Sequence, residues 1–278
     1  MHASEIENLA DGLLGVALAA ARAQMSHFRT NAELAVETKA DHSPVTEADR
    51  QSEAIILEGL ARLAPGVPVI AEEEVAAGRI PTLDGPFFLV DPLDGTKGFI
   101  KGRPQFTINI GLIEERRPVF GLVYAPALAD FYVTTGPDKA ANAHLEPETT
   151  VTTLADCRFV ALRARVPDPH ALVALTSQSH LNRATESFLA GYQIIERRQL
   201  SSSLKFGILA KGEADLYPRV GPTSEWDTAA GHAVLAAAGG TVTTIDGKPL
   251  LYGNADRGFI NPDFVAWARG PLARVRAG

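Results

Sequence analysis

The chain has 278 residues, of which 46% are hydrophobic and 21% are charged, and its formal net charge is −7. This composition excludes a largely disordered protein. The acidic balance argues against a nucleic-acid scaffold, because sequence-independent binding to phosphate backbones requires a clustered basic surface.

We expect neither a secretion signal nor a transmembrane segment. The longest apolar stretch near the start, residues 13–21, lacks a basic leader and is too short to span a bilayer. The only cysteine, Cys157, excludes an intrachain disulfide and suits a reducing compartment. A cytoplasmic location is therefore expected, with peripheral contact to the cytoplasmic face of the inner membrane left open.

The first half of the chain predicts two helices followed by a sheet. Ser4 and Glu7 match a capping box that opens an Ala-rich helix to about residue 27, and a second helix begins at Thr46 and runs to about Leu63. The polar segment between them, residues 39–45, predicts a loop or a short hairpin. Strand patterns follow, the last three of them antiparallel, at residues 67–70, 87–90, 106–113, 119–124 and 131–134.

The second half alternates between strand and helix patterns. Residues 136–156 are polar and low in large apolar side chains, so we predict an N-terminal α+β domain, residues 1–145, and a C-terminal α/β domain, residues 146–278. Strands are expected at residues 158–162, 193–197, 214–217 and 240–244, and helices at residues 169–189, 203–210 and 226–238.

Two carboxylates follow the apolar strand at residues 87–90. The strand pattern stops at Asp91, and Asp91-Pro92-Leu93-Asp94-Gly95 predicts a tight turn. Pro92 fixes one φ angle and Gly95 can adopt conformations closed to other residues, so carboxylates and carbonyls can point to one place. Hard cations such as Mg²⁺ prefer such oxygen ligands.

Two further acidic sites, Glu72-Glu73 and Asp227, also lie at the end of a strand or the start of a helix. Each carboxylate taken alone fits a helix cap or a solvent-exposed side chain. Taken together, they favour a bound cation, because Asp91 follows four large apolar residues and has no basic neighbour before Lys97.

Three motifs resemble the signatures of the inositol monophosphatase superfamily of metal-dependent, lithium-sensitive phosphatases. They are Asp-Pro-Leu-Asp-Gly-Thr at residues 91–96, Trp-Asp-Thr-Ala-Ala-Gly at residues 226–231, and Glu72-Glu73. Their order and spacing fit over nearly the whole chain. The resemblance implies a fold that combines α+β and α/β parts, the layered αβαβα sandwich of the inositol monophosphatase and fructose-1,6-bisphosphatase type.

Within this superfamily the chain is more similar to the 3′(2′),5′-bisphosphate nucleotidase branch. The similar segments are residues 41–49, Lys97, residues 201–206 and residues 212–219. Two positions depart from the pattern. Gly98 stands where the bacterial branch usually has glutamate, and Gln178 stands where an arginine is usual.

The resemblance implies two to three Mg²⁺ ions in the active site. The ligands that it implies for the first ion are Glu72, Asp91 and the backbone carbonyl of Leu93, and those for the second ion are Asp91, Asp94 and Asp227. Glu72 would also hold a third, largely hydrated ion near the attacking water. Thr96, oriented by Asp49, would hydrogen-bond that water, since a threonine hydroxyl is a poor base without a carboxylate partner. Asp49 equally fits a first-turn helix residue that interacts with the helix dipole.

The resemblance also implies substrate contacts, each of which has an ordinary alternative. Gly95, Thr96 and Lys97 would form a phosphate-binding turn, and His180 would contact the adenine. The second phosphate and the sugar would contact Ser201, Ser202, Ser203, Lys205 and Arg219. The alternatives are a solvent-exposed Lys97, a surface His180, and a helix start capped by serines with Lys205 in solvent.

The predicted function is that of a Mg²⁺-dependent phosphoric monoester hydrolase. It would remove the 3′-phosphate from adenosine 3′,5′-bisphosphate, with its sulfated precursor as a further candidate substrate, giving AMP in sulfate assimilation. One alternative is an inositol-1-phosphatase or another sugar phosphatase with the same metal core. Another is a non-catalytic, metal-dependent nucleotide- or phosphate-binding protein. The expected partner is a small phosphorylated nucleotide and no nucleic-acid polymer, and the chain is expected to be a monomer or a homodimer.

Overall fold

The structure, a computed structural model, describes residues 2–29, 36–38 and 44–274. Within these ranges we find no helix with the length and apolar content that a membrane span requires. The predicted hairpin is seen in part: β1 (Val36–Thr38) pairs with β2 (Pro44–Thr46) in antiparallel orientation, whereas residues 39–43 lie outside the described ranges.

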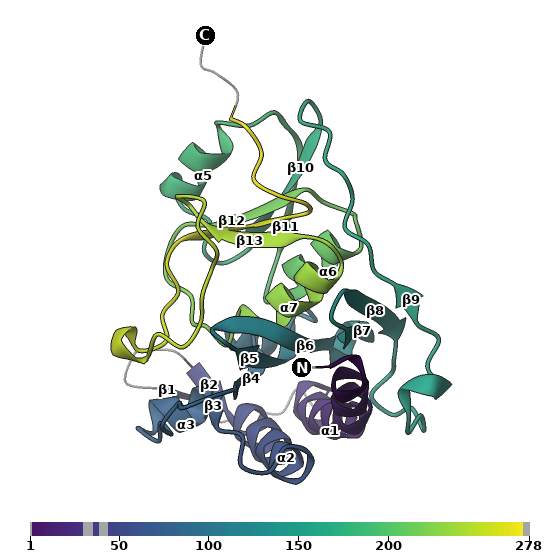
Figure 1. Cartoon of the computed structure of the whole chain (residues 1–278). Helices are drawn as coiled ribbons and strands as arrows, with labels where there is room; N and C mark the ends of the chain where they lie inside the picture. The colour runs from purple at the N-terminus through teal and green to yellow at the C-terminus, as the bar shows by residue number, and fades with distance from the viewer. Residues whose placement is uncertain (1, 30–35, 39–43, 275–278) are drawn as a thin grey trace.

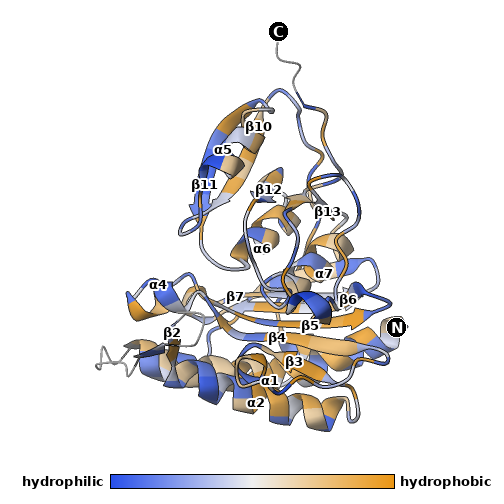
Figure 2. Cartoon of the chain, turned by 90° about the vertical axis from the view of Figure 1, so that its left-hand side faces the viewer, coloured by the Kyte–Doolittle hydropathy of each residue, from blue (hydrophilic) through white to orange (hydrophobic). Residues whose placement is uncertain are grey.

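Helices and two main sheets alternate in five layers (Figure 1). Helices α1 (Ala3–Arg29) and α2 (Glu47–Leu63) cover one face of a seven-stranded sheet. Helices α6 (Leu204–Ala210) and α7 (Ala229–Ala237) lie between this sheet and a five-stranded sheet, as Figure 2 also shows. Helix α5 (Arg183–Leu189) packs on the outer face of the second sheet. The predicted αβαβα sandwich is confirmed.

The seven-stranded sheet follows the order of the chain. All its neighbouring strands are antiparallel except the first pair, and the three antiparallel strands predicted from residue 106 onward are confirmed. The strands are β3 (Val69–Ala71), β4 (Phe87–Asp94), β5 (Thr107–Glu114), β6 (Arg117–Ala125), β7 (Asp130–Gly136), β8 (Lys139–His144) and β9 (Val160–Ala161). Strand β8 was not predicted, because its buried side chains are small alanines. The domain division at residue 145 remains a prediction.

The five-stranded sheet corrects one predicted element. Its strands, in spatial order, are β11 (Ile194–Leu200), β10 (Leu172–Ser177), β12 (Leu216–Arg219), β14 (Phe264–Trp267) and β13 (Thr241–Thr244). A helix over residues 169–189 was wrong, since residues 172–177 form β10 and helix α5 begins only at Arg183. Strand β10 packs against α5 on one face and the α6–α7 layer on the other, so residues 172–176 are all buried and the strand lacks the alternation of a half-buried strand.

The predicted start of the first helix is also wrong. Helix α1 begins at Ala3, so Ser4 is already inside it and cannot act as its cap. The backbone N–H of His2 instead donates to the Glu5 carboxylate, with 2.6 Å between nitrogen and oxygen.

Glycines let α7 lie directly on the seven-stranded sheet. A Cβ atom on Gly121 of β6 would be 2.1 Å from the carbonyl oxygen of Ala230, and one on Gly111 of β5 would be 2.9 Å from the Ala229 Cβ atom. No side chain larger than hydrogen fits at these two crossing points. Helix α7 and the segment before it are therefore held at a fixed height above β5 and β6.

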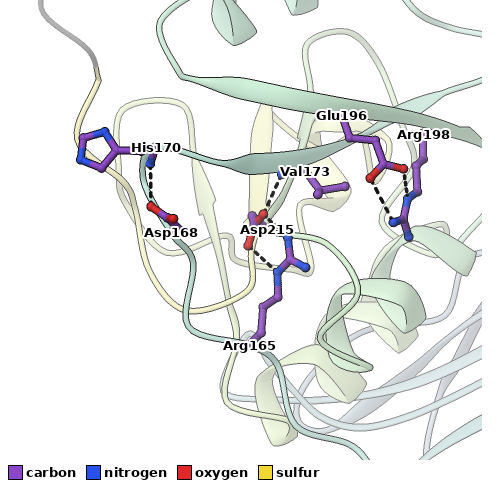
Figure 3. Close-up of polar contacts among 7 residues, drawn as sticks. All are labelled: Arg165, Asp168, His170, Val173, Glu196, Arg198 and Asp215. Atoms are coloured by element: carbon purple, nitrogen blue, oxygen red, sulfur yellow. Dashed lines mark hydrogen bonds and ion pairs between the residues drawn. The ribbon is translucent and has the colours of Figure 1, made fainter.

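A buried ion pair ties the connection before β10 to the second sheet (Figure 3). Asp215 is fully buried and accepts hydrogen bonds from Arg165, whose Nε lies 2.7 Å from Asp215 Oδ1, and from the backbone N–H of Val173 at 2.7 Å. A second contact joins Arg165 Nη2 to the other carboxylate oxygen. Glu196 and Arg198, also in Figure 3, form an exposed pair on β11.

Candidate active site

The end of β4 carries two of the predicted metal ligands. Asp91 is 2% exposed, and its Oδ1 accepts a hydrogen bond from the backbone N–H of Leu93 at 2.9 Å. The strand does not stop at Asp91 as predicted. It continues to Asp94, with a shift in its pairing to β5 between these two residues. Gly95 follows with a φ of 100° and caps helix α4 (Thr96–Ile100), so the predicted turn is a bulge closed by a left-handed glycine.

Two residues of helix α1, Gln24 and Phe28, make contacts that hold this turn in place. Gln24 of α1 is fully buried, and its Nε2 donates to the carbonyl oxygen of Pro92 at 2.6 Å. The rings of Phe28, Phe99 and Phe106 pack together with centroid separations of 4.9 to 5.4 Å. Sequence reasoning missed Gln24, for which the only signal is one amide in the Ala-rich first helix.

Asp49 joins the start of α2 to Thr96. Its Oδ2 accepts from the backbone N–H and the hydroxyl of Thr46, at 2.8 and 2.6 Å, and completes a capping box. Its Oδ1 lies 3.0 Å from Thr96 Oγ1 and accepts from that hydroxyl. Burial raises the pKa of Asp49, and the hydrogen bonds from Thr46 and Thr96 oppose that rise. Asp49 is thus both a first-turn residue of α2 and the partner of Thr96.

Glu72 begins the one-turn helix α3 (Glu72–Ala76), directly after β3. The next residue, Glu73, donates its backbone N–H to the Glu53 carboxylate of α2 at 2.9 Å. Glu53 is 5% exposed, and burial raises its pKa to about 7, with the negative charges of Glu73 and Glu74 adding to the rise. Sequence reasoning missed Glu53, although it lies four residues after Asp49, on the same face of α2.

Asp227 precedes α7 and does not begin it. The helix starts at Ala229 with Thr228 as its cap residue, so the predicted start at residue 226 is wrong. Asp227 Oδ2 accepts from the backbone N–H of Ser224 at 3.0 Å. Glu225, fully buried, holds this segment by accepting from the backbone N–H groups of residues 253 and 254 at 2.7 and 3.0 Å. Sequence reasoning missed Glu225.

The hydroxyl of Ser203 connects the two acidic segments. Its Oγ is 3.2 Å from Asp94 Oδ2 and 2.6 Å from the backbone carbonyl oxygen of Asp227. Ser203 was predicted to contact substrate. In the structure its side chain is buried between Asp94 and the Asp227 backbone, and its contact with substrate stays a prediction.

The carboxyl groups of Asp91, Asp94 and Asp227 all have a raised pKa, although the charge of Lys205 opposes the rise at Asp94. Burial is the largest cause for each, and the neighbouring negative charges, including that of Glu72, add to it. Among the described residues, no three His, Cys, Asp or Glu side chains form a ready-made metal cage. The donor set nevertheless fits Mg²⁺ chemically, because it consists of carboxylate oxygens that repel one another without a cation.

A cavity of about 240 Å³ joins most of the predicted site residues. Asp49, Asp91, Leu93 and Ser203 are buried and are not in its wall. The predicted residues in its wall are Glu72, Asp94, Gly95, Thr96, Lys97, His180, Ser201, Ser202, Lys205, Arg219 and Asp227. Eight residues that were not predicted as site residues also line it: Pro44, Gly98, Ser177, Ser179, Phe206, Tyr217, Thr223 and Thr228.

Lys205 is a buried cation in this wall. It is 3% exposed, so the alternative of a solvent-exposed lysine is wrong for this residue. Its ammonium group donates to the carbonyl oxygens of Ser202 and Leu200, the latter at 3.3 Å, and lies 4.9 Å from the centre of the Tyr217 ring. Burial lowers the Lys205 pKa to about 8 against the attraction of Asp94. Lys97, in contrast, is exposed.

Ser202 and Arg219 each keep a buried polar atom without a hydrogen-bond partner within the described residues. These atoms are the Ser202 hydroxyl oxygen and the Arg219 Nε. Ser202 has a φ of 50°, in the left-handed region, and the Arg219 guanidinium donates through Nη2 to the carbonyl oxygen of Pro222 at 2.7 Å. Unpaired buried polar groups are costly, so both atoms are suited to a ligand that enters the cavity.

The other predicted contacts lie at the rim. Ser201 donates its hydroxyl to the side-chain oxygen of Gln178 at 3.0 Å, so Gln178 is bonded to the serine segment. His180 is exposed, with its Nδ1 3.3 Å from the Ser177 hydroxyl oxygen. Partial burial, followed by the charge of Arg219, lowers the His180 pKa.

Comparisons with known proteins identify the family of this chain. The model of the inositol monophosphatase family matches residues 5–270. The 3′(2′),5′-bisphosphate nucleotidase CysQ of Escherichia coli is 41% identical over 229 residues, which cover 82% of this chain and 87% of that protein. CysQ of Salmonella typhimurium is 42% identical over 226 residues, covering 81% and 86%.

Solved structures give the same result. CysQ from Bacteroides thetaiotaomicron, a bacterial member of the inositol monophosphatase family, superposes with a TM-score of 0.78 at 31% identity, covering 95% of this chain and 98% of that one. An inositol monophosphatase from Thermotoga maritima shares the fold, with a TM-score of 0.70 at 23% identity over 91% and 89% of the two chains. This chain belongs to the inositol monophosphatase family.

Proposed function

We propose that this protein is a Mg²⁺-dependent 3′(2′),5′-bisphosphate nucleotidase. It removes the 3′-phosphate from adenosine 3′,5′-bisphosphate, and from its sulfated precursor, and gives AMP in the first case. The observation that carries the proposal is a cavity whose wall combines the acidic residues Glu72, Asp94 and Asp227, here called the acidic side, with Lys205, Arg219 and Ser202, here called the basic side. Such a cavity suits a substrate with one phosphate to be cleaved and a second to be held. CysQ proteins at 41 to 42% identity carry this activity in their name.

The residues at the acidic side are proposed to hold the metal. Glu72, Asp91 and the Leu93 carbonyl would bind one Mg²⁺, and Asp94 and Asp227 would join Asp91 at a second, with a third hydrated ion near Glu72. When bound, the metal supplies Lewis acidity and a water of lowered pKa. Asp49 keeps the Thr96 hydroxyl in place beside the Leu93 carbonyl, 3.1 Å away, so that Thr96 can hydrogen-bond the attacking water.

The basic side is proposed to bind the second phosphate and the sugar. Lys205 is held by two backbone carbonyls, so its charge stays fixed in the wall of the cavity. Little conformational entropy of this side chain is therefore lost when substrate binds. The unpaired Ser202 hydroxyl and Arg219 Nε would gain partners from phosphate oxygens. Gly95, Thr96 and Lys97 would hold the phosphate that is cleaved, while Ser201 and His180 would contact the nucleoside.

Phosphate release tests the activity. Adenosine 3′,5′-bisphosphate, its sulfated precursor and inositol 1-phosphate are each assayed with Mg²⁺ and with EDTA. We expect the first to be hydrolysed fastest and only with Mg²⁺. Faster turnover of inositol 1-phosphate would favour the sugar phosphatase, and no phosphate release from any ester would favour the binding protein.

A matched substrate pair tests the basic side. Adenosine 3′-monophosphate lacks the second phosphate, so Arg219→Met should raise KM for the bisphosphate more than KM for the monophosphate. Equal changes in the two KM values would remove Arg219 from the proposed second phosphate site. An exposed control, Lys139→Met, should leave both unchanged.

The cellular location and the oligomeric state are also part of the proposal. One cysteine, Cys157, suits a cytoplasmic location, and peripheral membrane contact is not proposed. A monomer or a homodimer remains the prediction for its assembly.

A further inference from the structure

Helix α2 carries two buried carboxylates on one face. Asp49 and Glu53 are four residues apart and 2% and 5% exposed, and residues at this spacing are neighbours on a helix surface. Asp49 reaches α4 through the Thr96 hydroxyl, and Glu53 reaches α3 through the backbone N–H of Glu73. One rigid helix therefore contacts both the segment that carries Thr96 and the segment that carries Glu72.

Helix α3 has no cap of its own. It has five residues, and the residue before it, Ala71, has no side chain that can accept a hydrogen bond. The first N–H groups of any helix have no partner within the helix, and a helix of one turn is not stable by itself. Glu53 accepts one of these N–H groups from outside, at 2.9 Å, and so replaces the missing cap.

A glutamate at position 53 is unfavourable for the stability of the fold. Its carboxylate is buried and lies in the negative field of Glu73, Glu74 and Glu72, which together with burial raises its pKa. An apolar side chain of similar size would avoid this cost. The Glu53 carboxylate accepts the hydrogen bond from α3 and is attracted by the charge of Arg79, which follows that helix.

We propose that Glu53 is a positioning residue that holds the first turn of α3, and with it Glu72, at a fixed distance from Thr96. The inference rests on the proposed function in that it takes Glu72 as a metal ligand. Residues that support metal ligands typically change metal affinity about 10- to 100-fold when they are replaced.

Two substitutions in the full chain separate the hydrogen bond from packing. Glu53→Met keeps the length of the side chain and removes both the acceptor and the buried charge. Glu53→Gln keeps an acceptor oxygen and removes only the charge. The control is Glu58→Ala, on the exposed face of α2, where Glu58 forms an ion pair with Arg62.

Three measurements are made on each variant. Mn²⁺ binding is followed by the electron paramagnetic resonance signal of the free ion, hydrogen exchange by mass spectrometry over residues 71–77, and stability by the melting temperature. For Glu53→Met we expect about 10-fold weaker Mn²⁺ binding and faster exchange over residues 71–77, with a melting temperature no lower than that of the wild type. Glu53→Gln should restore most of the Mn²⁺ affinity and most of the protection from exchange over residues 71–77. Glu58→Ala should match the wild type in all three measurements.

Wild-type Mn²⁺ affinity and exchange in Glu53→Met would overturn the proposal. The same holds if Glu53→Gln is as impaired as Glu53→Met, because the acceptor would then not be the cause. A wild-type protein that neither binds Mn²⁺ nor releases phosphate would instead refute the proposed function, and the exchange data would still decide whether Glu53 holds α3.

Discussion

The contact between α7 and β6 offers a direct test of how the fold sets the position of Asp227. In Gly121→Ala the new Cβ atom would lie 2.1 Å from the Ala230 carbonyl oxygen, whereas ordinary contact begins at 3.4 Å. The nearest atom belongs to the backbone, so no change of rotamer relieves the overlap. Helix α7 must move away from the sheet by roughly an ångström, a shift that can cost about 100-fold in rate when it reaches a catalytic group.

The expected loss of stability follows from the same overlap. Overpacking a core typically costs about 1 to 3 kcal/mol, and we expect Gly121→Ala to lie at the upper end because both partners are backbone. The control is Gly15→Ala on α1, where a Cβ would meet nothing within 4 Å and should stabilise the helix by about 0.5 to 1 kcal/mol. Urea denaturation gives both values, and kcat/KM for the bisphosphate reports the shift at the site. An unfolding free energy for Gly121→Ala within about 0.5 kcal/mol of the wild type would refute the reasoning.

Four further outcomes are expected. Asp94→Asn should lower kcat by more than about 100-fold in a steady-state assay, since even residues that only support metal ligands cost about 10- to 100-fold, while the fold stays intact. Lithium at about millimolar concentration should inhibit phosphate release by competing with Mg²⁺. His232 is buried and hydrogen-bonded to Tyr252, and its pKa is lowered to about 3, so the unfolded chain binds a proton between that value and 6.5 that the folded chain does not. Wild-type stability should therefore fall, relative to His232→Gln, by up to about 1.4 kcal/mol for each pH unit below 6.5. Asp215→Ala should lower the unfolding free energy by about 3 kcal/mol, because it leaves the Val173 N–H buried and unpaired and removes the partner of Arg165, whereas Glu196→Ala at the exposed pair should have little effect on the unfolding free energy.

Each of these has an outcome that would contradict it. Near wild-type turnover in Asp94→Asn would remove Asp94 from the metal site, and full activity in lithium would argue against a weakly held Mg²⁺. Parallel stability curves for the wild type and His232→Gln between pH 4 and pH 6 would show that His232 is not buried in neutral form. Equal costs for Asp215→Ala and Glu196→Ala would mean that burial of the Asp215 pair has no energetic effect.

The sequence predicts best where the chemistry is local. Residues 91–96 place two carboxylates, a proline and a glycine within one bulge, and the structure keeps them there. The fold class also followed, because the order of strand and helix patterns and three short motifs identified the family. Local patterns carry this information because their spacing is set by the backbone itself.

Residues that act through distant partners were harder to find. Glu53, Gln24 and Glu225 each hold a segment of the site from another part of the chain, and each is a single polar residue within an ordinary pattern. The burial of Lys205 was missed for the same reason, since serines followed by a lysine also describe an exposed helix start. These assignments depend on which elements meet, which one sequence does not contain.

The error at residues 172–177 has a different cause. A strand that is buried on both faces loses the alternation of apolar and polar residues, so its pattern also fits a buried helix. Length is the better guide here, because the apolar run, residues 171–175, is only five residues long.

The hydroxyl of Ser203 has a consequence for how the site forms. It links the carboxylate of Asp94 to the backbone of Asp227, residues that are 133 positions apart in the chain. During synthesis, Asp91 and Asp94 emerge long before the segment that completes their surroundings, and contacts of such sequence separation form slowly. The surroundings of these two mutually repelling carboxylates are therefore incomplete until the last third of the chain has been synthesised and folded. Metal-dependent activity should appear only as a late step of refolding, after the seven-stranded sheet has formed and α7 has docked on it.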